Sequence, residues 1–479
     1  MQAVAPTSHV DALQRIRATL GPAGCIDAPE QTARFLTDFR GQYRGATPFV
    51  ACPATTTEVA QVLALCNAAR IAVVPQGGNT SYCGGATPSA RGDQLVLSLH
   101  RLNRIREVDA ANFSLIAEAG CVLMNVQAAA RSVDRLFPLS LGSEGSCQIG
   151  GNLSTNAGGL AAVRYGVARD LVLGLEVVLA DGRVIDGLSS LRKDNTGYDL
   201  RDLFVGAEGT LGIITAASLK LFPQPRTIET AFIAVPGMQA AIDLLARLRE
   251  ATGDCVTTFE YLPRIAVEFT IRHIPGVSDP LGVPHPAYVL CEVSTARHDP
   301  HLRGLLEDAL GAAIDHGDAI EATFAESISQ RQALWRLRES VPEAQRHEGA
   351  SIKHDVAVPV AALPAFLRQA SAAVAQVAPS ARLVAYGHVG DGNLHFNLSE
   401  PAGGGDRAAF LALQQDLGHA VHACVQEFKR SISAEHGIGQ LKRELLARHK
   451  DPVALAAMRS IKQALDPRGI LNPGKVLPD

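Results

Sequence analysis

The chain has 479 residues, of which 47% are hydrophobic and 19% charged, and these values exclude a disordered or fibrous protein and a single simple core. A formal net charge of −4, from 44 basic and 48 acidic side chains, argues against nucleic acid as a partner. No apolar run reaches the roughly 20 residues of a membrane helix and the N-terminal segment lacks a secretory signal, so we expect no transmembrane segment and a cytoplasmic location, or the mitochondrial matrix in a eukaryote. The nine cysteines form no C-x-x-C pair, which favours buried thiols over disulfides or a zinc–thiolate cluster.

The first part of the chain alternates predicted helices and strands around glycine-rich loops. Thr55 and Glu58 have the spacing of a capping box, which predicts a helix through about Arg70, and the run 71–74 predicts a buried strand. Further elements are expected in this order: strands at 95–99 and 113–118, a helix at 122–136, a hairpin over 171–186 and a long strand over 211–222.

A second α/β domain is predicted after Pro223 and Pro225 interrupt the chain. Its apolar-periodic helices are expected at 238–250, 301–314 and 361–377, between strands. From about Asp406 the sequence predicts mostly helix. We therefore expect three parts, with boundaries at 1–224, 225–430 and 431–479.

Three glycine tracts lie in the first domain, at 77–85, 142–151 and 158–159. Glycine lets backbone N–H groups approach a ligand closely, and the asparagine, serine and threonine residues among these glycines suit a dinucleotide, although tight turns would have the same composition. No G-x-G-x-x-G leads from a strand into a helix and no G-x-x-x-x-G-K-[ST] is present, which disfavours Rossmann and P-loop sites.

Four motifs point to a family: PQGGNTSYCGG, PLSLGSEGSCQIGGNLSTNAGG, SLRKDNTGYDLRDLFVGAEGTLGIIT and ILNPGK. Together they resemble flavoproteins of the vanillyl-alcohol-oxidase type, in the branch of FAD-linked D-2-hydroxy-acid dehydrogenases that act on D-2-hydroxyglutarate. The resemblance extends from about residue 40 to 477. It implies an α+β fold: an FAD-binding domain of two α/β subdomains at 1–224, an α/β substrate-binding cap domain at 225–430, and a helical segment at 431–479 that returns to the flavin.

On this resemblance FAD lies extended between the two subdomains, with the pyrophosphate at the first glycine loop and the isoalloxazine near residues 138–139. The chain has no histidine between Pro75 and Leu99 that could tether the flavin, so we expect non-covalent FAD. The expected cofactor-binding residues are Pro75, Gln76, Gly77, Gly78, Asn79, Thr80, Ser81, Pro138, Leu139, Gly142, Gly145, Ser146, Gly150, Gly151, Asn152, Thr155, Asn156, Gly209, Ile213 and Asn472.

Histidines gather in the strings GHVGDGNLHFN and AEHGIG. The first predicts a hairpin that carries His388 and His395, and the second supplies Glu435 and His436. Two imidazoles and one carboxylate suit zinc, manganese, cobalt or iron, and three protein ligands leave a position for substrate. Each histidine taken alone would more often be an ordinary core or surface residue.

The resemblance assigns roles to these residues. His388, His395 and Glu435 would bind a divalent metal, for which we expect zinc with manganese or cobalt as alternatives, and His436 would be the general base. Arg338, Lys353, Asn397 and His436 would bind substrate, because a guanidinium and an ammonium suit a dianionic acid. Pro342 departs from the pattern, since the hydroxyglutarate enzymes have a hydroxyl-bearing residue there, so a different D-2-hydroxy acid is an open alternative.

The expected reaction is oxidation of a D-2-hydroxy acid, D-2-hydroxyglutarate first, to the 2-oxo acid by hydride transfer to flavin N5. D-lactate or glycolate is the alternative substrate. A non-catalytic flavin-binding subunit of an oxidase complex and a mononuclear iron oxygenase are alternatives of other classes. Since no nicotinamide site is visible, the expected acceptor of the flavin's electrons is an electron-transfer flavoprotein or a quinone. Separately, we expect the chain to form a homodimer.

Overall fold

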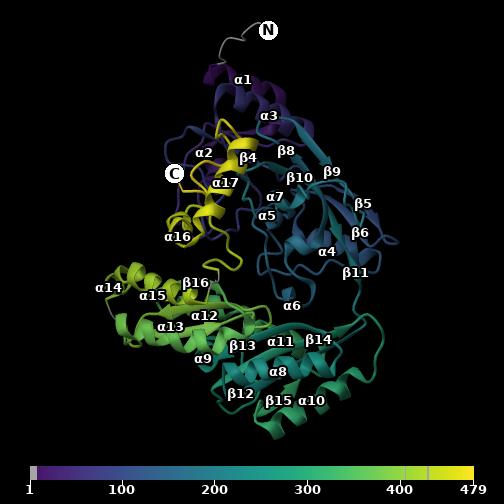
Figure 1. Ribbon diagram of the computed structural model, residues 1–479, viewed down its shortest axis with the longest axis vertical. Helices are drawn as coiled ribbons and strands as arrows, with labels where there is room; N and C mark the ends of the chain where they lie inside the picture. The colour runs from purple at the N-terminus through teal and green to yellow at the C-terminus, as the bar shows by residue number, and fades with distance from the viewer. Residues whose placement is uncertain (1–7, 405, 429–430, 479) are drawn as a thin grey trace. The chain divides into compact units, whose positions relative to one another are not determined.

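The computed structural model describes residues 8–404, 406–428 and 431–478. It contains two compact units (Figure 1). Within the described residues, unit 1 runs to Gly158 and includes Val167–Gln224 and the chain from Glu435 onward. Unit 2 comprises Gly159–Gly166 and Pro225–Ala434. The last segment of the chain therefore folds with the first.

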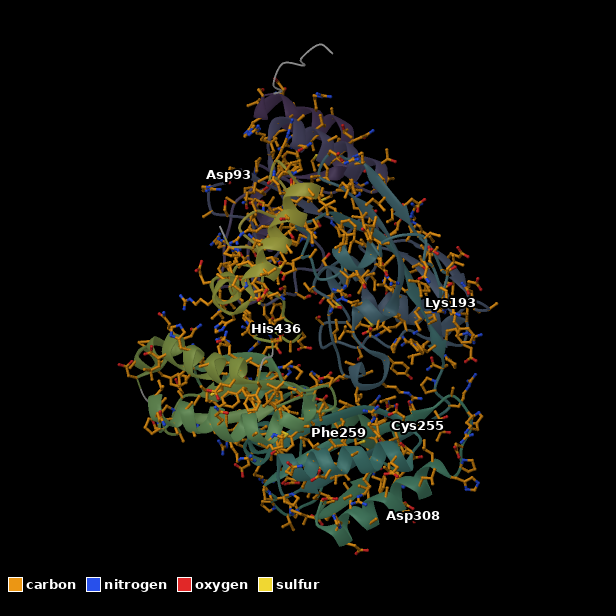
Figure 2. All side chains as sticks on the ribbon, in the orientation of Figure 1. Asp93, Lys193, Cys255, Phe259, Asp308 and His436 are labelled. Atoms are coloured by element: carbon orange, nitrogen blue, oxygen red, sulfur yellow. The ribbon has the colours of Figure 1, made fainter. Side chains whose placement is uncertain are left out.

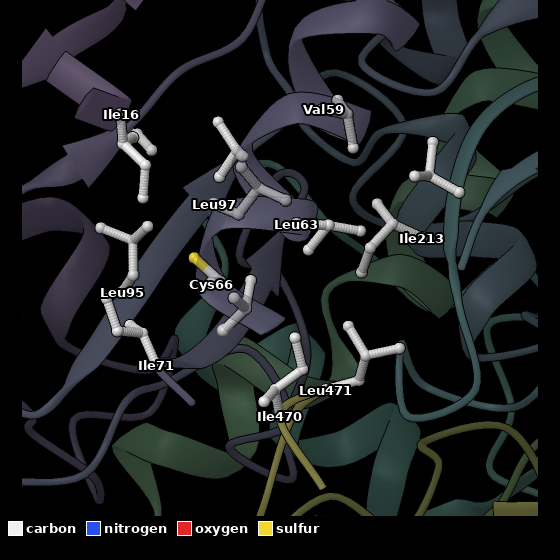
Figure 3. Packing of buried hydrophobic residues seen from close by; sticks show 14 of the residues in the cluster. Ile16, Val59, Leu63, Cys66, Ile71, Leu95, Leu97, Ile213, Ile470 and Leu471 are labelled. Carbon is white, nitrogen blue, oxygen red and sulfur yellow. The ribbon is translucent and has the colours of Figure 1, made fainter. Parts of the chain in front are cut away.

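Unit 1 begins with a small sheet of order β1-β2-β4-β3, in which β3 and β4 run parallel. Its strands are β1 (Cys25–Ile26), β2 (Val50–Ala51), β3 (Ala72–Gln76) and β4 (Gln94–Ser98). The capping box is confirmed: the Thr55 side chain accepts from the Glu58 N–H and α3 (Thr56–Ala69) follows. Apolar side chains of α3, the sheet and the C-terminal residues Ile470 and Leu471 form one core (Figure 3).

The second sheet of unit 1 is antiparallel, with order β5-β6-β10-β8-β9. Its strands are β5 (Ile105–Asp109), β6 (Ser114–Glu118), β8 (Val172–Val178), β9 (Val184–Gly187) and β10 (Ile213–Lys220). The hairpin predicted over 171–186 is confirmed by the β8–β9 pairing. The predicted helix at 122–136 was too long: α4 (Leu123–Ser132) ends early, because Asp134 takes a positive φ and β7 (Arg135–Leu136) pairs with β11 (Phe222–Pro223).

The other helical elements of unit 1 are α1 (His9–Leu20), η1 (Pro22–Gly24), α2 (Pro29–Leu36), α5 (Ile149–Ser154), η2 (Ala168–Leu171), α7 (Arg201–Phe204), α16 (Arg443–His449) and α17 (Pro452–Leu465). All nine cysteines are free thiols, as predicted.

Unit 2 contains two antiparallel sheets. The first has the order β13-β14-β12-β15, with β12 (Thr227–Val235), β13 (Val256–Pro263), β14 (Ala287–Thr295) and β15 (Glu321–Phe324). The second has the order β16-β18-β17, with β16 (Ser351–Ala357), β17 (Arg382–Tyr386) and β18 (Asn393–Ser399). The helices are α6 (Ala162–Tyr165), α8 (Met238–Ala251), α9 (Arg264–His273), α10 (Leu302–His316), α11 (Ile328–Glu339), α12 (Val341–His347), η3 (Val360–Ala362), α13 (Leu363–Val377), α14 (Arg407–Ala412) and α15 (Gln414–Glu427).

Helices cover both faces of the three-stranded sheet. On one face, the Phe366 ring of α13 lies 5.9 Å from the Phe396 ring of β18, and α15 packs against α13. On the other, Val384 and Tyr386 join a core cluster with residues of α9, α11 and α12. The stretch Val360–Val377 is long and apolar enough to count as a candidate membrane span, but a single such helix is weak evidence for one.

Candidate active site

Two of the predicted cofactor loops pack directly on each other in unit 1. A Cβ on Gly78 would lie 2.2 Å from the carbonyl oxygen of Ser146, and a Cβ on Gly77 would touch the Gln148 side chain at 3.5 Å. Glycine is needed at position 78 because the backbone of the second tract occupies the space of a side chain, whereas the contact at Gly77 is an ordinary one. The loop after β3 and the residues before α5 therefore form one continuous surface.

The C-terminal motif ILNPGK joins the same region. Leu471 bridges Val73 of β3, and the Asn472 side chain donates to the carbonyl oxygens of Gly85 and Glu208. Gly209 has φ +71°, and a Cβ there would lie 2.4 Å from the Pro75 ring. Four separate segments of unit 1 thus meet at the carboxyl end of β3.

Three side-chain oxygens in this region are buried without a hydrogen-bond partner among the described residues: Oε1 of Gln148, Oδ1 of Asn152 and Oδ1 of Asn472. An unsatisfied buried acceptor costs about 1–3 kcal/mol, so each of these oxygens fits a ligand that donates hydrogen bonds. The residues present therefore fit FAD. The sequence predicted Asn152 and Asn472 but not Gln148, which the motif QIGG places just before α5.

Other predicted cofactor residues hold the loops in place. The Asn79 side chain donates to the carbonyl oxygens of Arg34 and Thr37, and Gln76 donates to those of Phe35 and Ala86. Among the remaining predicted residues, the Asn156 side chain accepts from the backbone N–H of Arg169, and the hydroxyl groups of Thr155 and Ser146 donate to the carbonyl oxygens of Gly151 and Ser143. The carbonyl oxygen of Leu139 accepts from the Gln127 side chain. Gly150 packs on Ala119, and Ile213 lies in the hydrophobic core. Pro138 is buried, Thr80 and Ser81 are half-buried, and Gly142 and Gly145 are exposed.

The predicted histidine hairpin is confirmed in unit 2 as β17 and β18. The rings of His388 and His395 lie 5.4 Å apart between centroids, at 77° to one another. Gly387, with φ +135°, precedes His388, and a Cβ there would come within 3.1 Å of the His395 ring. The hairpin therefore brings the two imidazoles together.

The strand register places further predicted residues beside these histidines. In the β16–β18 pair, Lys353 lies opposite Asn397 and Asp355 lies opposite His395. Directly opposed residues project to the same face of an antiparallel sheet, so all four side chains share one face. The Asn393 side chain, on the same face, donates to Asp355 Oδ1 at 2.8 Å.

Arg338, at the end of α11, is 6% exposed and forms an ion pair that the sequence did not predict. Its Nε and an Nη donate to Oε2 of Glu260 at 2.7 Å, while Oε1 of Glu260 lies 2.6 Å from His388 Nδ1. Burial alone would raise the pKa of Glu260, but its attraction to His388 and Arg338 lowers that pKa to about 2. Glu260 is therefore an ionised carboxylate that is fully buried between two predicted site residues.

Asn397 is held by a buried neighbour on α12. Its side-chain N–H donates to Gln345 Oε1 at 3.1 Å, and Gln345 donates in turn to the Ser399 hydroxyl at 3.0 Å. Pro342 occupies the first turn of α12, where proline is tolerated because its missing N–H would have no helical partner. The sequence did not predict Gln345, one turn later on this helix.

The remaining predicted residues, Glu435 and His436, lie in unit 1. His436 is labelled in Figure 2. Its ring contacts the ring of Tyr82 edge to face, with centroids 4.8 Å apart, and its Nε2 is 3.6 Å from Glu435. The residue before Glu435 is anchored in unit 2, since the Ala434 N–H donates to the carbonyl oxygen of Asp355.

Comparisons with known proteins identify the family of the chain. The model of the FAD linked oxidases, C-terminal domain, matches residues 224–476, and that of the FAD binding domain matches residues 47–187. The mitochondrial D-2-hydroxyglutarate dehydrogenases of Arabidopsis thaliana and Danio rerio are 38% and 39% identical, over 96% and 98% of this chain and 80% and 85% of theirs. The D-2-hydroxyglutarate–pyruvate transhydrogenase of Saccharomyces cerevisiae is 35% identical, over 94% of this chain and 90% of its own length.

Solved structures confirm the predicted fold class. p-Cresol methylhydroxylase with bound substrate has a TM-score of 0.72 at 17% identity, with 98% of this chain and 96% of that chain covered. 4-Ethylphenol oxidase from Gulosibacter chungangensis has the same TM-score and identity, with 99% and 98% covered. Both are flavoproteins of the vanillyl-alcohol-oxidase type. The chain belongs to the FAD-linked oxidases, in the branch of the FAD-dependent D-2-hydroxy-acid dehydrogenases.

Proposed function

We propose that this protein is an FAD-dependent dehydrogenase that oxidises a D-2-hydroxy acid to the 2-oxo acid, requires a divalent metal for this reaction and has D-2-hydroxyglutarate as its best substrate. One observation carries the proposal most directly: Lys353 and Asn397 share one sheet face with His395, and Arg338 is bound to the carboxylate that contacts His388. Cationic and amide donors thus lie beside the two imidazoles, as recognition of an acidic substrate requires.

The proposed metal ligands are His388, His395 and Glu435. The two histidine rings are close together, and Ala434 fixes the chain to Asp355 immediately before Glu435. This donor set of two imidazoles and one carboxylate suits zinc, with manganese or cobalt as alternatives. Such an ion, when bound, lowers the pKa of a coordinated hydroxyl group.

In the proposed reaction the chain's own residues bind substrate and move a proton. Arg338, Lys353 and Asn397 hold the acid by its carboxylate groups, and His436 takes the proton of the C2 hydroxyl at its imidazole nitrogen. Non-covalent FAD, when bound to the loops of unit 1, supplies the acceptor for the hydride that leaves C2. The residues assigned to FAD are those of the four unit 1 segments described above.

A substrate screen tests this proposal. Bleaching of the enzyme-bound flavin would be followed with D-2-hydroxyglutarate, D-malate, D-lactate and glycolate, each D acid beside its L enantiomer. We expect the D diacids to bleach the flavin fastest, because two cations serve two carboxylates. A preference for D-lactate or glycolate would contradict the assignment of a diacid substrate. It would agree with the presence of Pro342 where the hydroxyglutarate enzymes have a hydroxyl-bearing residue. Loss of all bleaching with intact bound flavin would support the alternative of a non-catalytic flavin subunit.

The reduced flavin needs an acceptor. We propose an electron-transfer flavoprotein or a quinone, and a homodimeric enzyme. The plant and fish relatives are named as mitochondrial, which supports the matrix as the location if the source is a eukaryote. Reoxidation assays with each acceptor, and light scattering for the oligomeric state, test these assignments.

A further inference from the structure

The Glu260 carboxylate contacts one proposed metal ligand and one proposed substrate-binding residue at the same time. Its side chain is 0% exposed, Oε1 lies 2.6 Å from His388 Nδ1, and Oε2 accepts from two nitrogens of Arg338 at 2.7 Å. An ionised carboxylate only accepts hydrogen bonds, and the adjacent Arg338 keeps the charged form stable. His388 must therefore donate from Nδ1, which leaves its Nε2 lone pair for another partner.

The backbone fixes this contact. Tyr261 of β13 and Gly387 form an isolated bridge in which each N–H donates to the other's carbonyl oxygen at 3.0 Å. Glu260 and His388 are the neighbours of these two residues in the chain. Strand β13 therefore carries the carboxylate to the imidazole, and the geometry does not depend on two flexible side chains finding each other.

We propose that Glu260 is a positioning residue, which holds His388 in the tautomer and orientation that present Nε2 to the metal and which keeps Arg338 directed toward the substrate. The inference rests on the proposed function. Carboxylate groups that accept a hydrogen bond from a ligating histidine typically change metal affinity about 10–100-fold when they are mutated. One residue of β13 thus couples metal binding to carboxylate recognition.

A second buried carboxylate serves as the matched control. Glu292 on the adjacent strand β14 is 7% exposed, and it accepts from Arg331, from the Trp335 indole N–H and from Thr230. It shares with Glu260 the sheet, a buried position and an arginine partner, but its side chain accepts from Arg331, Trp335 and Thr230 and not from a histidine. Glu292→Gln therefore removes the charge of a second buried carboxylate, whose arginine partner is more exposed, without affecting the proposed role.

The experiment measures metal affinity on FAD-loaded protein from which metal has been removed by chelation and desalting. Zn²⁺, Mn²⁺ and Co²⁺ are titrated separately by calorimetry into wild type, Glu260→Gln, Glu260→Asp and Glu292→Gln, and the melting temperature of each is recorded. We expect Glu260→Gln to weaken the preferred metal about 10–100-fold and to raise the KM for a diacid, while Glu292→Gln changes metal affinity less than about 2-fold. Glu260→Asp, which restores the charge, should recover part of the affinity.

The outcomes of this experiment separate the positioning role of Glu260 from the proposed metal site. Wild-type metal affinity in Glu260→Gln would overturn the positioning role and leave the proposed metal site intact. Failure of the wild type to bind any of the three ions would overturn both. If Glu260→Gln does not fold, Glu260→Asp decides the question: a purely structural role predicts that its affinity equals that of Glu292→Gln at a matched melting temperature.

Discussion

At the scale of single residues, His436 is the group whose removal should separate chemistry from cofactor binding. Its imidazole is flanked by Tyr82 and Glu435, and neither of these two neighbours is among the residues assigned to FAD. We expect His436→Ala to lower kcat about 10²–10⁴-fold, the usual contribution of a general base, while the purified protein stays yellow.

The measurement is kcat together with the visible flavin absorbance of the same sample. His298→Ala, at an exposed position of unit 2, is the control and should behave as wild type. Normal turnover of His436→Ala would remove this residue from the mechanism.

Sequence reasoning named those residues of the proposed site that lie next to a local sequence signal and missed those that do not. His388 and His395 flank a glycine-containing turn, which predicted their hairpin correctly. Glu260 has no such signal, because TTFEYLP reads as an ordinary buried strand and its partner His388 lies 128 residues further along the chain. Gln345 was missed for the same reason, since its contact with Asn397 exists only after α12 packs on the sheet.

At the scale of elements, strongly patterned segments were predicted well and weakly patterned ones were not. Helices α8, α10 and α13 lie within two residues of their predicted bounds. Strand β5 was not predicted, because its sequence IREVD is charged and its edge position leaves it half exposed. The long strand predicted at 211–222 is interrupted between β10 and β11, where pairing changes from β6 and β8 to β7.

The packing of the two glycine loops can be tested by adding one methyl group. In Gly78→Ala the new Cβ would lie 2.2 Å from a backbone oxygen of Ser146, which cannot rotate away. We expect a loss of about 1–3 kcal/mol in the unfolding free energy of the FAD-free protein, with a lower melting temperature and less FAD retained.

Gly142→Ala is the matched control in the same predicted cradle, because a Cβ there meets nothing within 4 Å. Its FAD-free protein should melt at the wild-type temperature. Equal melting temperatures for the two variants would show that the loops do not pack as described.

An ion-pair cluster in unit 2 predicts a pH dependence of stability. Glu348, with a side chain 8% exposed, joins Arg272 and His273 of α9 to Arg382 of β17. Burial would raise the pKa of Glu348, but hydrogen bonds from Arg382, His273 and Arg272 lower it to about 2. Since the folded pKa lies below the unfolded value of about 4.3, this stabilisation is complete above that pH and is lost as the pH falls toward 2.

We therefore expect Glu348→Gln to be less stable than wild type near neutral pH, by at most about 3 kcal/mol, and the difference to shrink below about pH 4 and to vanish only below about pH 2. Thermal unfolding of both proteins across this range measures it. Glu326→Gln, which breaks an exposed pair with Arg303, should cost less than about 1 kcal/mol at any pH. A constant difference between wild type and Glu348→Gln would contradict the assignment.

At the scale of the whole molecule, the order of the chain differs from its grouping in space. The segment Gly159–Gly166 folds with unit 2, where Arg164 donates to the carbonyl oxygens of Ser294 and Cys255. Local patterns could not predict this, because a helix of four residues carries no periodicity that identifies its partner. The return of the C-terminal segment to unit 1 was expected from the family resemblance and not from the pattern of residues.

This grouping predicts that metal and flavin can be removed independently. The residues assigned to FAD all belong to unit 1, whereas two of the three proposed metal ligands, His388 and His395, belong to unit 2. The third, Glu435, belongs to unit 1 but is not among the residues assigned to FAD. Treatment with a chelator should therefore abolish turnover while the visible absorbance of the bound flavin remains, because no proposed FAD contact uses a metal ligand. Adding back zinc, manganese or cobalt singly should restore activity with one ion best, and His388→Ala should resist restoration by any of them. Turnover that survives exhaustive chelation, with metal content confirmed as negligible by elemental analysis, would contradict metal dependence while leaving the flavin assignment in place.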